Sequence, residues 1–296
     1  MPPIIDSHIH MYPAEVYADP IAWGTAHREP WWTYCVAPPH QPTLQGWATV
    51  DELLRDMDKA GVDRSVMLGW YWERQETSEL QNSWFSEWVK AHPDRISGFA
   101  AVTASAGTRA VEATRRALDA GLCGLGELLP QAQNFSFKDD NWAALMALAL
   151  EYNVPTNLHV TDPLSFNPES CTKATPLESY IELLRDFPEN TFILAHWGGG
   201  IPFYELGPRL RPLFKNVYYD SAASPLLYDN KAYRLICDIV GPERMLFGTD
   251  YPLFTHPTIE KKPGFERDLA DARAGGLTPA ELELVLGESA RRLLRL

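Results

Sequence analysis

The sequence predicts a closed barrel of eight parallel strands, each followed by a helix: a (β/α)8 or TIM barrel in a single domain. Short apolar runs alternate with helical segments along nearly all of the 296 residues, and a chain of this length is typical of one such barrel. No internal repeat, low-complexity tract or linker indicates a second domain. An open doubly wound sheet is the alternative architecture that the same alternation allows.

The predicted strands are brief apolar runs, as expected for strands that are buried on both faces of a parallel sheet. There are eight of them, the number that one closed barrel needs. They are Ile4–His8, Ser65–Trp70, Ile96–Val102, Cys123–Leu128, Thr156–Val160, Thr191–His196, Val217–Asp220 and Met245–Thr249.

Between these runs, apolar residues recur at helical spacing. In the first helical segment, Leu53 and Met57 fall on one face. Gly121 follows the second segment as a C-terminal cap. Thr278 precedes the last segment as an N-cap, with Pro279 at the first helical position. The predicted helices are Val50–Ala60, Thr108–Ala120, Asn141–Tyr152, Leu177–Phe187, Tyr228–Val240 and Pro279–Leu296.

Residues 11–48 interrupt the alternation. They contain many prolines and aromatic residues and show no clear periodicity. A loop of this length inside a compact domain usually serves a function. Because it follows the first strand, we expect it to cover the C-terminal mouth of the barrel, where the active sites of this fold lie.

The net charge of −13 argues against nucleic acid and anionic membranes as partners. No run of about 18 apolar residues could cross a membrane, and the N-terminal MPPIIDSHIH lacks the features of a secretory signal. The four cysteines, Cys35, Cys123, Cys171 and Cys237, are scattered and form no C-x-x-C pair. We therefore expect a reduced, cytoplasmic protein that acts on a small molecule.

The first predicted strand leads into the motif D-S-H-I-H. Because side chains alternate along a strand, His8 and His10 point to the same side, where two imidazoles can hold one first-row divalent metal ion. His159, His196 and Asp250 each end or follow a different apolar run. In a barrel such ends meet at one mouth, so we expect these side chains to share a site with the two histidines.

Five motifs together resemble the amidohydrolase superfamily. The resemblance is closest to the amidohydrolase-related branch that contains aminocarboxymuconate-semialdehyde decarboxylase, resorcylate decarboxylase and pyrone-dicarboxylate lactonase. It covers nearly the whole chain, and the order and spacing of the motifs make it specific. The motifs are D-S-H-I-H at Asp6–His10, N-L-H at Asn157–His159, L-A-H-W-G-G-G at Leu194–Gly200, Y-Y-D-S-A at Tyr218–Ala222 and F-G-T-D-Y-P at Phe247–Pro252.

The resemblance implies a role for each matched residue. His8 and His10 correspond to the first-strand metal ligands, and His159 corresponds to the fifth-strand ligand. Asp250 corresponds to the carboxylate that binds the metal and accepts a proton from water. His196 corresponds to a histidine that polarises the substrate or transfers a proton. The metal is expected to be zinc, with manganese as the alternative, because sites of this kind accept several divalent ions.

Glu127 leaves open whether the site holds one ion or two. It follows Gly126 at the end of the predicted fourth strand, where many binuclear members of the superfamily carry a bridging lysine or glutamate. If Glu127 bridges, His159 and His196 both bind the second ion. Otherwise Glu127 supports the ligands of one ion or contacts the substrate. Asp220 matches a seventh-strand position that is often acidic in this branch, and we expect it to form hydrogen bonds near the mouth.

Aromatic residues in two loops predict a mostly apolar pocket for a planar or ring-bearing substrate. Trp72 belongs to a Trp-Tyr-Trp run after the second strand, and further tryptophans lie in the segment after the first strand. Arg28 and Arg74 lie on loops that can reach the mouth, and an arginine can bind a substrate carboxylate in bidentate fashion. A place on the outer surface is the alternative for both arginines.

Three functions fit these residues. The main interpretation is hydrolysis of an ester, lactone or amide bond by metal-activated water, with Asp250 and His196 transferring protons. The alternative is non-oxidative decarboxylation of an aromatic or unsaturated acid, which needs a cation placed for the carboxylate. The third is a barrel that binds a ligand without catalysis, and the presence of all the expected groups argues against it. A homodimer is expected by analogy with other barrels.

Overall fold

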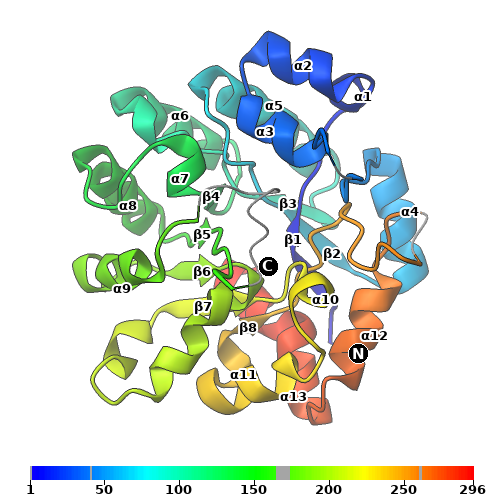
Figure 1. The fold of residues 1–296 in the computed structure, drawn as a ribbon, viewed down its shortest axis with the longest axis vertical. Helices are drawn as coiled ribbons and strands as arrows, with labels where there is room; N and C mark the ends of the chain where they lie inside the picture. The colour runs from blue at the N-terminus through cyan, green and yellow to red at the C-terminus, as the bar shows by residue number, and fades with distance from the viewer. Residues whose placement is uncertain (1, 41, 165–173, 260–261) are drawn as a thin grey trace.

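A computed structural model describes residues 2–40, 42–164, 174–259 and 262–296. Hydrogen-bonded ladders of parallel strands join β1 to β3 and β4 to β8. Single bridges between Ala100 and Leu125 and between Ile9 and Tyr251 close the ring, which confirms the predicted barrel (Figure 1). The strands are β1 (Ile5–Ile9), β2 (Arg64–Met67), β3 (Ile96–Gly98), β4 (Leu125–Leu128), β5 (Thr156–Leu158), β6 (Phe192–Leu194), β7 (Val217–Asp220) and β8 (Met245–Leu246).

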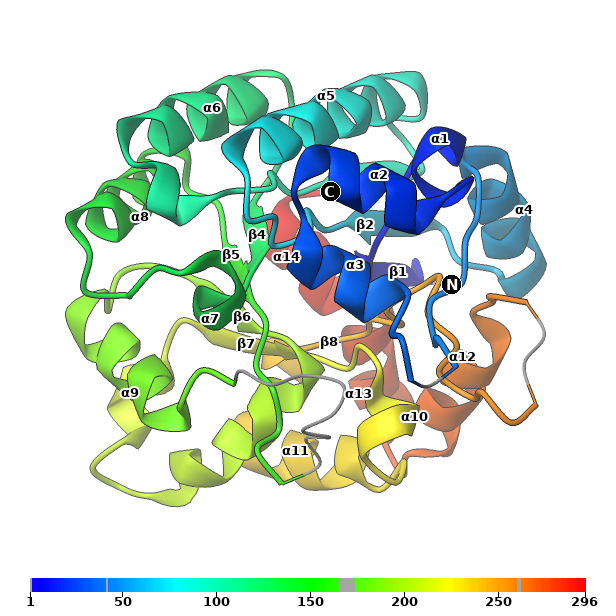
Figure 2. The same ribbon diagram turned by 45° about the horizontal axis from the view of Figure 1, so that its top comes forward.

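Helices surround the strands in both views (Figures 1 and 2). Thr278 caps α13 through the backbone N–H of Glu281, with Pro279 in the first turn, as the sequence predicts. A π-helical turn, Leu284–Glu288, divides the last predicted helix into two. The helices outside the 11–48 segment are α4 (Val50–Ala60), α5 (Gln75–Ala91), α6 (Thr108–Asp119), α7 (Pro130–Gln133), α8 (Asp140–Tyr152), α9 (Leu177–Asp186), α10 (Ser224–Leu227), α11 (Ala232–Val240), α12 (Glu266–Ala274), α13 (Pro279–Glu283) and α14 (Ser289–Leu294).

The segment that follows β1 is partly helical, so the expectation of a plain loop was wrong. Pro20 and Pro30 each stand at the start of a helix, where the fixed φ of proline suits the helix and no N–H is lost. Asp19 caps the second helix through the N–H of Ala22. Trp32 packs in one apolar cluster with residues 70–72 after β2. The three helices are α1 (Ala14–Tyr17), α2 (Pro20–His27) and α3 (Pro30–Val36).

No helix within the described ranges is both long and apolar enough to cross a membrane. Among the described residues, Cys35, Cys123 and Cys237 form no disulfide. Cys171 lies outside the described residues.

Candidate metal centre

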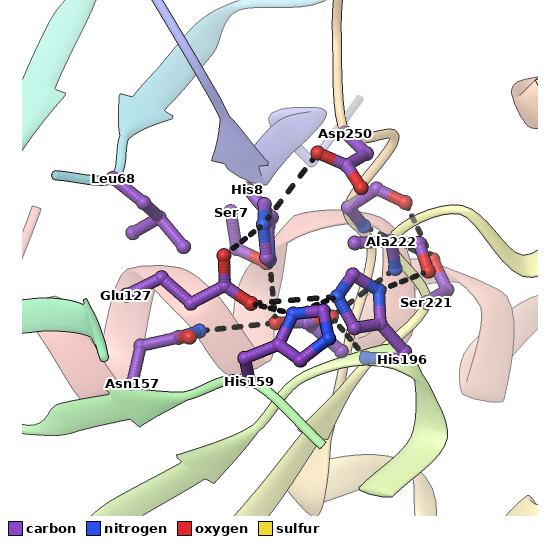
Figure 3. A network of polar contacts seen from close by, with 12 residues as sticks. Ser7, His8, Leu68, Glu127, Asn157, His159, His196, Ser221, Ala222 and Asp250 are labelled. Carbon is purple, nitrogen blue, oxygen red and sulfur yellow. Dashed lines mark hydrogen bonds and ion pairs between the residues drawn. The ribbon is translucent and has the colours of Figure 1, made fainter. Parts of the chain in front are cut away.

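Six side chains meet at the C-terminal ends of five strands, and Figure 3 labels all of them except His10. Their donor atoms fall into three overlapping groups, and within each group all the atoms lie within 4.8 Å of one another. Each group combines residues from at least two of the strands or from the segments that directly follow them. The six are His8 in β1, His10 after it, Glu127 in β4, His159 after β5, His196 after β6 and Asp250 after β8.

His8 and His10 are the first pair of candidate ligands. Their Nε2 atoms lie 3.3 Å apart, and two nitrogens that share a tetrahedral zinc at about 2.1 Å lie roughly 3.4 Å apart. Glu127 Oε2 is 3.4 Å from His10 Nε2 and 3.7 Å from His8 Nε2. Asp250 Oδ1 completes the group at 3.5 Å and 3.8 Å from the same two nitrogens. This spacing fits one divalent cation between two imidazoles and two carboxylates.

His159 and His196 are the second pair of candidate ligands. His159 Nδ1 lies 3.1 Å from His196 Nε2. Glu127 Oε1 is 2.9 Å from the first of these nitrogens and 3.4 Å from the second. The two oxygens of Glu127 therefore face different pairs: Oε2 faces the first pair and Oε1 the second. A carboxylate in this position can bridge two ions.

Hydrogen bonds fix the ring nitrogens that face away from the centre. His8 Nδ1 is 3.0 Å from Asp220 Oδ2, and His10 Nδ1 is 3.2 Å from the carbonyl oxygen of Leu68. His196 Nδ1 is 2.9 Å from the carbonyl oxygen of Ala222. When each Nδ1 donates its proton outward, the Nε2 lone pair of the same ring is directed at the centre, as metal ligation requires.

Asp220 is a fully buried carboxylate with four hydrogen-bond donors around it. Its Oδ2 lies next to His8 and also accepts from Asn157 Nδ2 at 3.1 Å. Its Oδ1 accepts from the backbone N–H groups of His196 and Ala222, each at 3.1 Å. One carboxylate therefore ties the β1 ligand to the β6–β7 side of the mouth. The sequence predicts hydrogen bonds for Asp220, but it does not identify these partners.

Burial and neighbouring charges shift the pKa values of these histidines and of Glu127. Burial alone would lower the pKa of His8, but the carboxylates of Asp220 and Glu127 outweigh it and raise the pKa to about 10. Burial also opposes ionisation of Glu127, but His159 and His8 hold its pKa well below the usual range. For His196, burial is outweighed by Glu127 and the pKa rises to about 9. Burial lowers the pKa of His159. A cation bound here must therefore displace protons.

The turn after β6 needs glycine. His196 and Trp197 have φ values of 57° and 54°, and three glycines with positive φ follow them. A Cβ on Gly198 would lie 3.0 Å from the Tyr219 ring, and a Cβ on Gly199 would lie 3.0 Å from Val160. The glycine run lets the chain reverse closely over neighbouring strands and holds His196 at the mouth.

A cavity of about 250 Å³ opens directly onto the centre. Trp70 and Tyr71 form an aromatic wall, with their rings stacked at 4.2 Å. The segment that follows β1 contributes Cys35 and Gln45, which the sequence analysis did not single out. The lining residues are His10, Cys35, Gln45, Trp70, Tyr71, Glu127, His159, Val160, Thr161, Asp162, His196, Ala223, Leu227, Asp250, Pro252 and Leu253.

The three residues predicted to contact substrate lie elsewhere. Trp72 is fully buried, and its Nε1 donates to Gln81 Oε1 at 2.6 Å. Arg28 and Arg74 line a separate outer hollow together with Tyr34. Arg74 Nε donates to the carbonyl oxygen of Arg28 at 3.4 Å. Among the described residues, the cavity lining contains no arginine or lysine.

Imidazoles and carboxylates gathered at the C-terminal ends of barrel strands define the class of metal-dependent barrel enzymes. The family can also be stated. The family model described as "Amidohydrolase" matches residues 5–296, so the chain belongs to the amidohydrolase family.

Solved structures share this fold along the whole chain. The 2,6-dihydroxybenzoate decarboxylase from Rhizobium is 17% identical with a TM-score of 0.72, and the match covers 100% of this chain and 99% of that one. The 5-carboxyvanillate decarboxylase from Sphingomonas paucimobilis is 17% identical with a TM-score of 0.76, and both chains are covered completely. A dihydroxybenzoic acid decarboxylase from Polaromonas, solved with manganese and 2-nitroresorcinol, is 17% identical with a TM-score of 0.71, over 100% and 97% of the two chains.

Proposed function

We propose that this protein catalyses the metal-dependent, non-oxidative decarboxylation of a small aromatic or unsaturated carboxylic acid. One observation carries the proposal. The cavity joins an aromatic wall to the ligand set, and its described lining holds no arginine or lysine. Histidines are the only nitrogen bases in this described lining, so a cation bound by the candidate ligands would be the main positive charge that faces a substrate carboxylate. The fold shared with three aromatic acid decarboxylases supports the same reaction.

In this proposed reaction, different residues have different roles. A bound divalent ion would supply the positive charge that holds the carboxylate. Trp70 and Tyr71 would pack against the planar body of the substrate and exclude water from one side. Asp250 or His196 would donate a proton to the carbon that bears the carboxylate. The bond to the carboxyl carbon then breaks, its electron pair stays on the protonated carbon, and carbon dioxide leaves.

Hydrolysis of an ester, lactone or amide is the second candidate, and the position of Glu127 favours it. The two carboxylate oxygens face the two ligand pairs separately, as expected for a bridge between ions about 3.5–4 Å apart. His196 would then be a ligand, and Asp250 would take the proton of the attacking water.

Metal content and carbon dioxide release together test both candidates. The protein is purified without chelator or histidine tag, and metal is counted by plasma mass spectrometry. Carboxyl-labelled 2,6-dihydroxybenzoate and 5-carboxyvanillate are the first substrates, assayed beside a panel of esters and lactones. Glu127→Gln tests the bridge, and Glu112→Gln, an exposed carboxylate on α6, is the matched control.

Release of labelled carbon dioxide with about one ion per chain would support decarboxylation with His196 free to transfer protons. Hydrolysis of the esters or lactones without carbon dioxide, with two ions per chain that Glu127→Gln reduces, would overturn decarboxylation in favour of the second candidate. A protein that binds no metal after reconstitution would contradict both.

A further inference from the structure

His159 faces the candidate metal centre with a different ring nitrogen from the other three histidines. His8, His10 and His196 each turn Nε2 towards the centre and Nδ1 towards an outer acceptor. In His159 the order is reversed. Its Nδ1 lies 2.9 Å from Glu127 Oε1, whereas its Nε2 faces away from the centre. If Nδ1 binds a cation, the proton of the neutral ring must therefore be on Nε2.

The hydroxyl of Thr161 is the partner of that outer nitrogen. Thr161 Oγ1 lies 3.1 Å from His159 Nε2. The backbone of Thr161 packs closely against the glycine run after β6, because a Cβ on Gly199 would lie 3.1 Å from the Thr161 carbonyl oxygen. When Nε2 carries the ring proton, it can only donate, so Thr161 Oγ1 accepts this hydrogen bond.

The proton of the Thr161 hydroxyl is then free for a different acceptor. A hydroxyl that accepts one hydrogen bond can still donate its own proton. Within the parts of the chain that the structure describes, the contact with His159 is the only hydrogen bond of the Thr161 side chain. Thr161 is partly buried and lines the cavity that opens onto the candidate metal centre. Its O–H is therefore available to an acceptor on a molecule bound in this cavity.

The position of the hydroxyl determines which part of a substrate it can reach. An ion bound by His159 Nδ1 would lie about 2.1 Å from that nitrogen, and the width of the imidazole ring and the hydrogen bond to Thr161 place Oγ1 roughly 6–7 Å from the ion. This distance is too long for the group of the substrate that binds the ion. It suits a substituent about one benzene ring away from that group.

We propose that Thr161 is a specificity-determining residue that selects an acid with an acceptor oxygen about one ring's length from the metal-bound carboxylate. An ether, carbonyl or hydroxyl oxygen meets this requirement. An apolar substituent of the same size leaves the hydroxyl without an acceptor, which weakens binding by the contribution of one hydrogen bond. This inference rests on the proposed function, because it assumes that the acid group of the substrate lies at the ligand set.

The test uses the metal-loaded protein and two pairs of matched probes. 3-Methoxybenzoate is compared with 3-ethylbenzoate, and 4-methoxybenzoate with 4-ethylbenzoate, because each pair exchanges an ether oxygen for a methylene group of similar size. Calorimetry at saturating metal gives the ratio of the dissociation constants within each pair. In at least one pair, we expect Thr161→Val to lower the preference for the methoxy probe by about three- to tenfold, the range of one neutral hydrogen bond. Thr161→Ser keeps the hydroxyl and should retain the wild-type ratio within about twofold.

Thr25→Val is the matched control and should leave both ratios unchanged. Thr25 is exposed, and its hydroxyl donates to the carbonyl oxygen of Ile21 at 2.7 Å, outside the cavity lining. Thr161→Ala removes the same hydroxyl and replaces Thr161→Val in the test if the valine variant does not fold. Wild-type ratios in the folded variant without the hydroxyl would overturn the inference. A loss of preference in Thr161→Ser as large as in Thr161→Val would overturn it as well.

The outcome is separate from that of the proposed function. If the probes respond to Thr161 as expected but no acid loses carbon dioxide, the specificity assignment stands and decarboxylation fails. If acids lose carbon dioxide but the ratios do not depend on Thr161, the reverse holds.

Discussion

Replacing Asp220 with asparagine should weaken metal binding without removing any residue that we place in the ligand set. The carboxylate lies 3.0 Å from His8 Nδ1, on the side of the ring opposite the centre. In Asp220→Asn the charge is lost, and the amide can present its N–H₂ group to a ring nitrogen that also carries a proton. His8 then loses the partner that fixes its tautomer and makes its Nε2 more basic.

The magnitude follows from the distances. Across the ring and a metal–nitrogen bond of about 2.1 Å, the carboxylate lies roughly 7 Å from the ion. A unit charge and a divalent ion at this separation attract by about 5 kcal/mol at an effective dielectric constant of about 20. This is an upper bound, because asparagine keeps a dipole and the site rearranges. Changes to such outer partners typically reduce metal affinity about 10–100-fold, or roughly 1.4–2.7 kcal/mol, which falls inside the bound.

The assay is competition with a chromogenic chelator, for zinc and for manganese, at one fixed pH. Asn157→Ala is the matched control, because it removes a donor to the same oxygen but leaves the charge, and we expect a loss of less than about threefold, consistent with one neutral hydrogen bond. Thermal midpoints of the metal-free proteins separate a ligand effect from a folding effect. If Asp220→Asn folds and binds both metals as the wild type does, the reasoning about His8 is refuted.

Four further outcomes are expected. Asp250→Asn should bind metal more weakly and, at saturating metal, lose roughly 10²–10⁴-fold in turnover, measured with metal content on the same samples. Metal affinity should rise with pH up to about pH 10. Because the pKa of His8 is raised to about 10, protons compete with the metal ion for this ring below that pH. Metal titrations at pH 6, 7 and 8 check that the affinity rises with pH. Burial raises the pKa of Glu29 from 4.5 to about 7. The stability that Glu29 contributes is complete below pH 4.5, and about 3 kcal/mol of it is lost as the pH rises through 7. Urea unfolding should show this fall in the free energy of unfolding in the wild type and not in Glu29→Gln. Glu205→Ala should cost about 3–5 kcal/mol in the same assay, because it leaves Arg244 without its bidentate partner.

The barrel and the gathering of the candidate ligands at its mouth could be predicted because their signals are local. A buried parallel strand is encoded as a short apolar run. A polar residue at the C-terminal end of such a run lies at the mouth of the barrel, and this position does not depend on how the helices and loops pack. Six of the eight predicted strands are correct in position but too long, whereas Val217–Asp220 has the predicted bounds and the first strand is shifted by one residue. Ile96–Val102, for example, contracts to Ile96–Gly98, because Ala100 forms only an isolated bridge to Leu125. The apolar run continues there into side chains that pack under the mouth.

Helix α5 could not be predicted from apolar periodicity, because its buried residues, apart from Phe85, are polar. Gln81 and Asn82 are both buried on it. Gln81 Oε1 accepts from the backbone N–H of Trp70 and from Trp72 Nε1. Asn82 exchanges two hydrogen bonds with the backbone of Ala101. These partners lie on the segments after β2 and β3, so the signal for the helix is tertiary.

The same limit explains the substrate contacts. Arg28 and Arg74 have the right chemistry for a carboxylate, but both line an outer hollow that is separate from the cavity at the candidate metal centre. Glu29, between them in space, accepts N–H groups from Glu73 and Arg74 and so joins the two loops. The sequence shows which arginine side chains are available, whereas the packing of α2 and α3 determines which of them can reach the substrate.

The charge of the centre links the metal count to the role of His196. Glu127, Asp220 and Asp250 surround the ligand nitrogens with three negative charges. One divalent ion leaves one negative charge, which a protonated His196 cancels; the imidazolium is then available as a proton donor to a carbon acid. Two divalent ions leave one positive charge and occupy His196 as a ligand, and Asp250 is then the free proton acceptor that hydrolysis needs. A single count of ions per chain therefore also decides which residue carries the proton, and through it which bond of the substrate breaks.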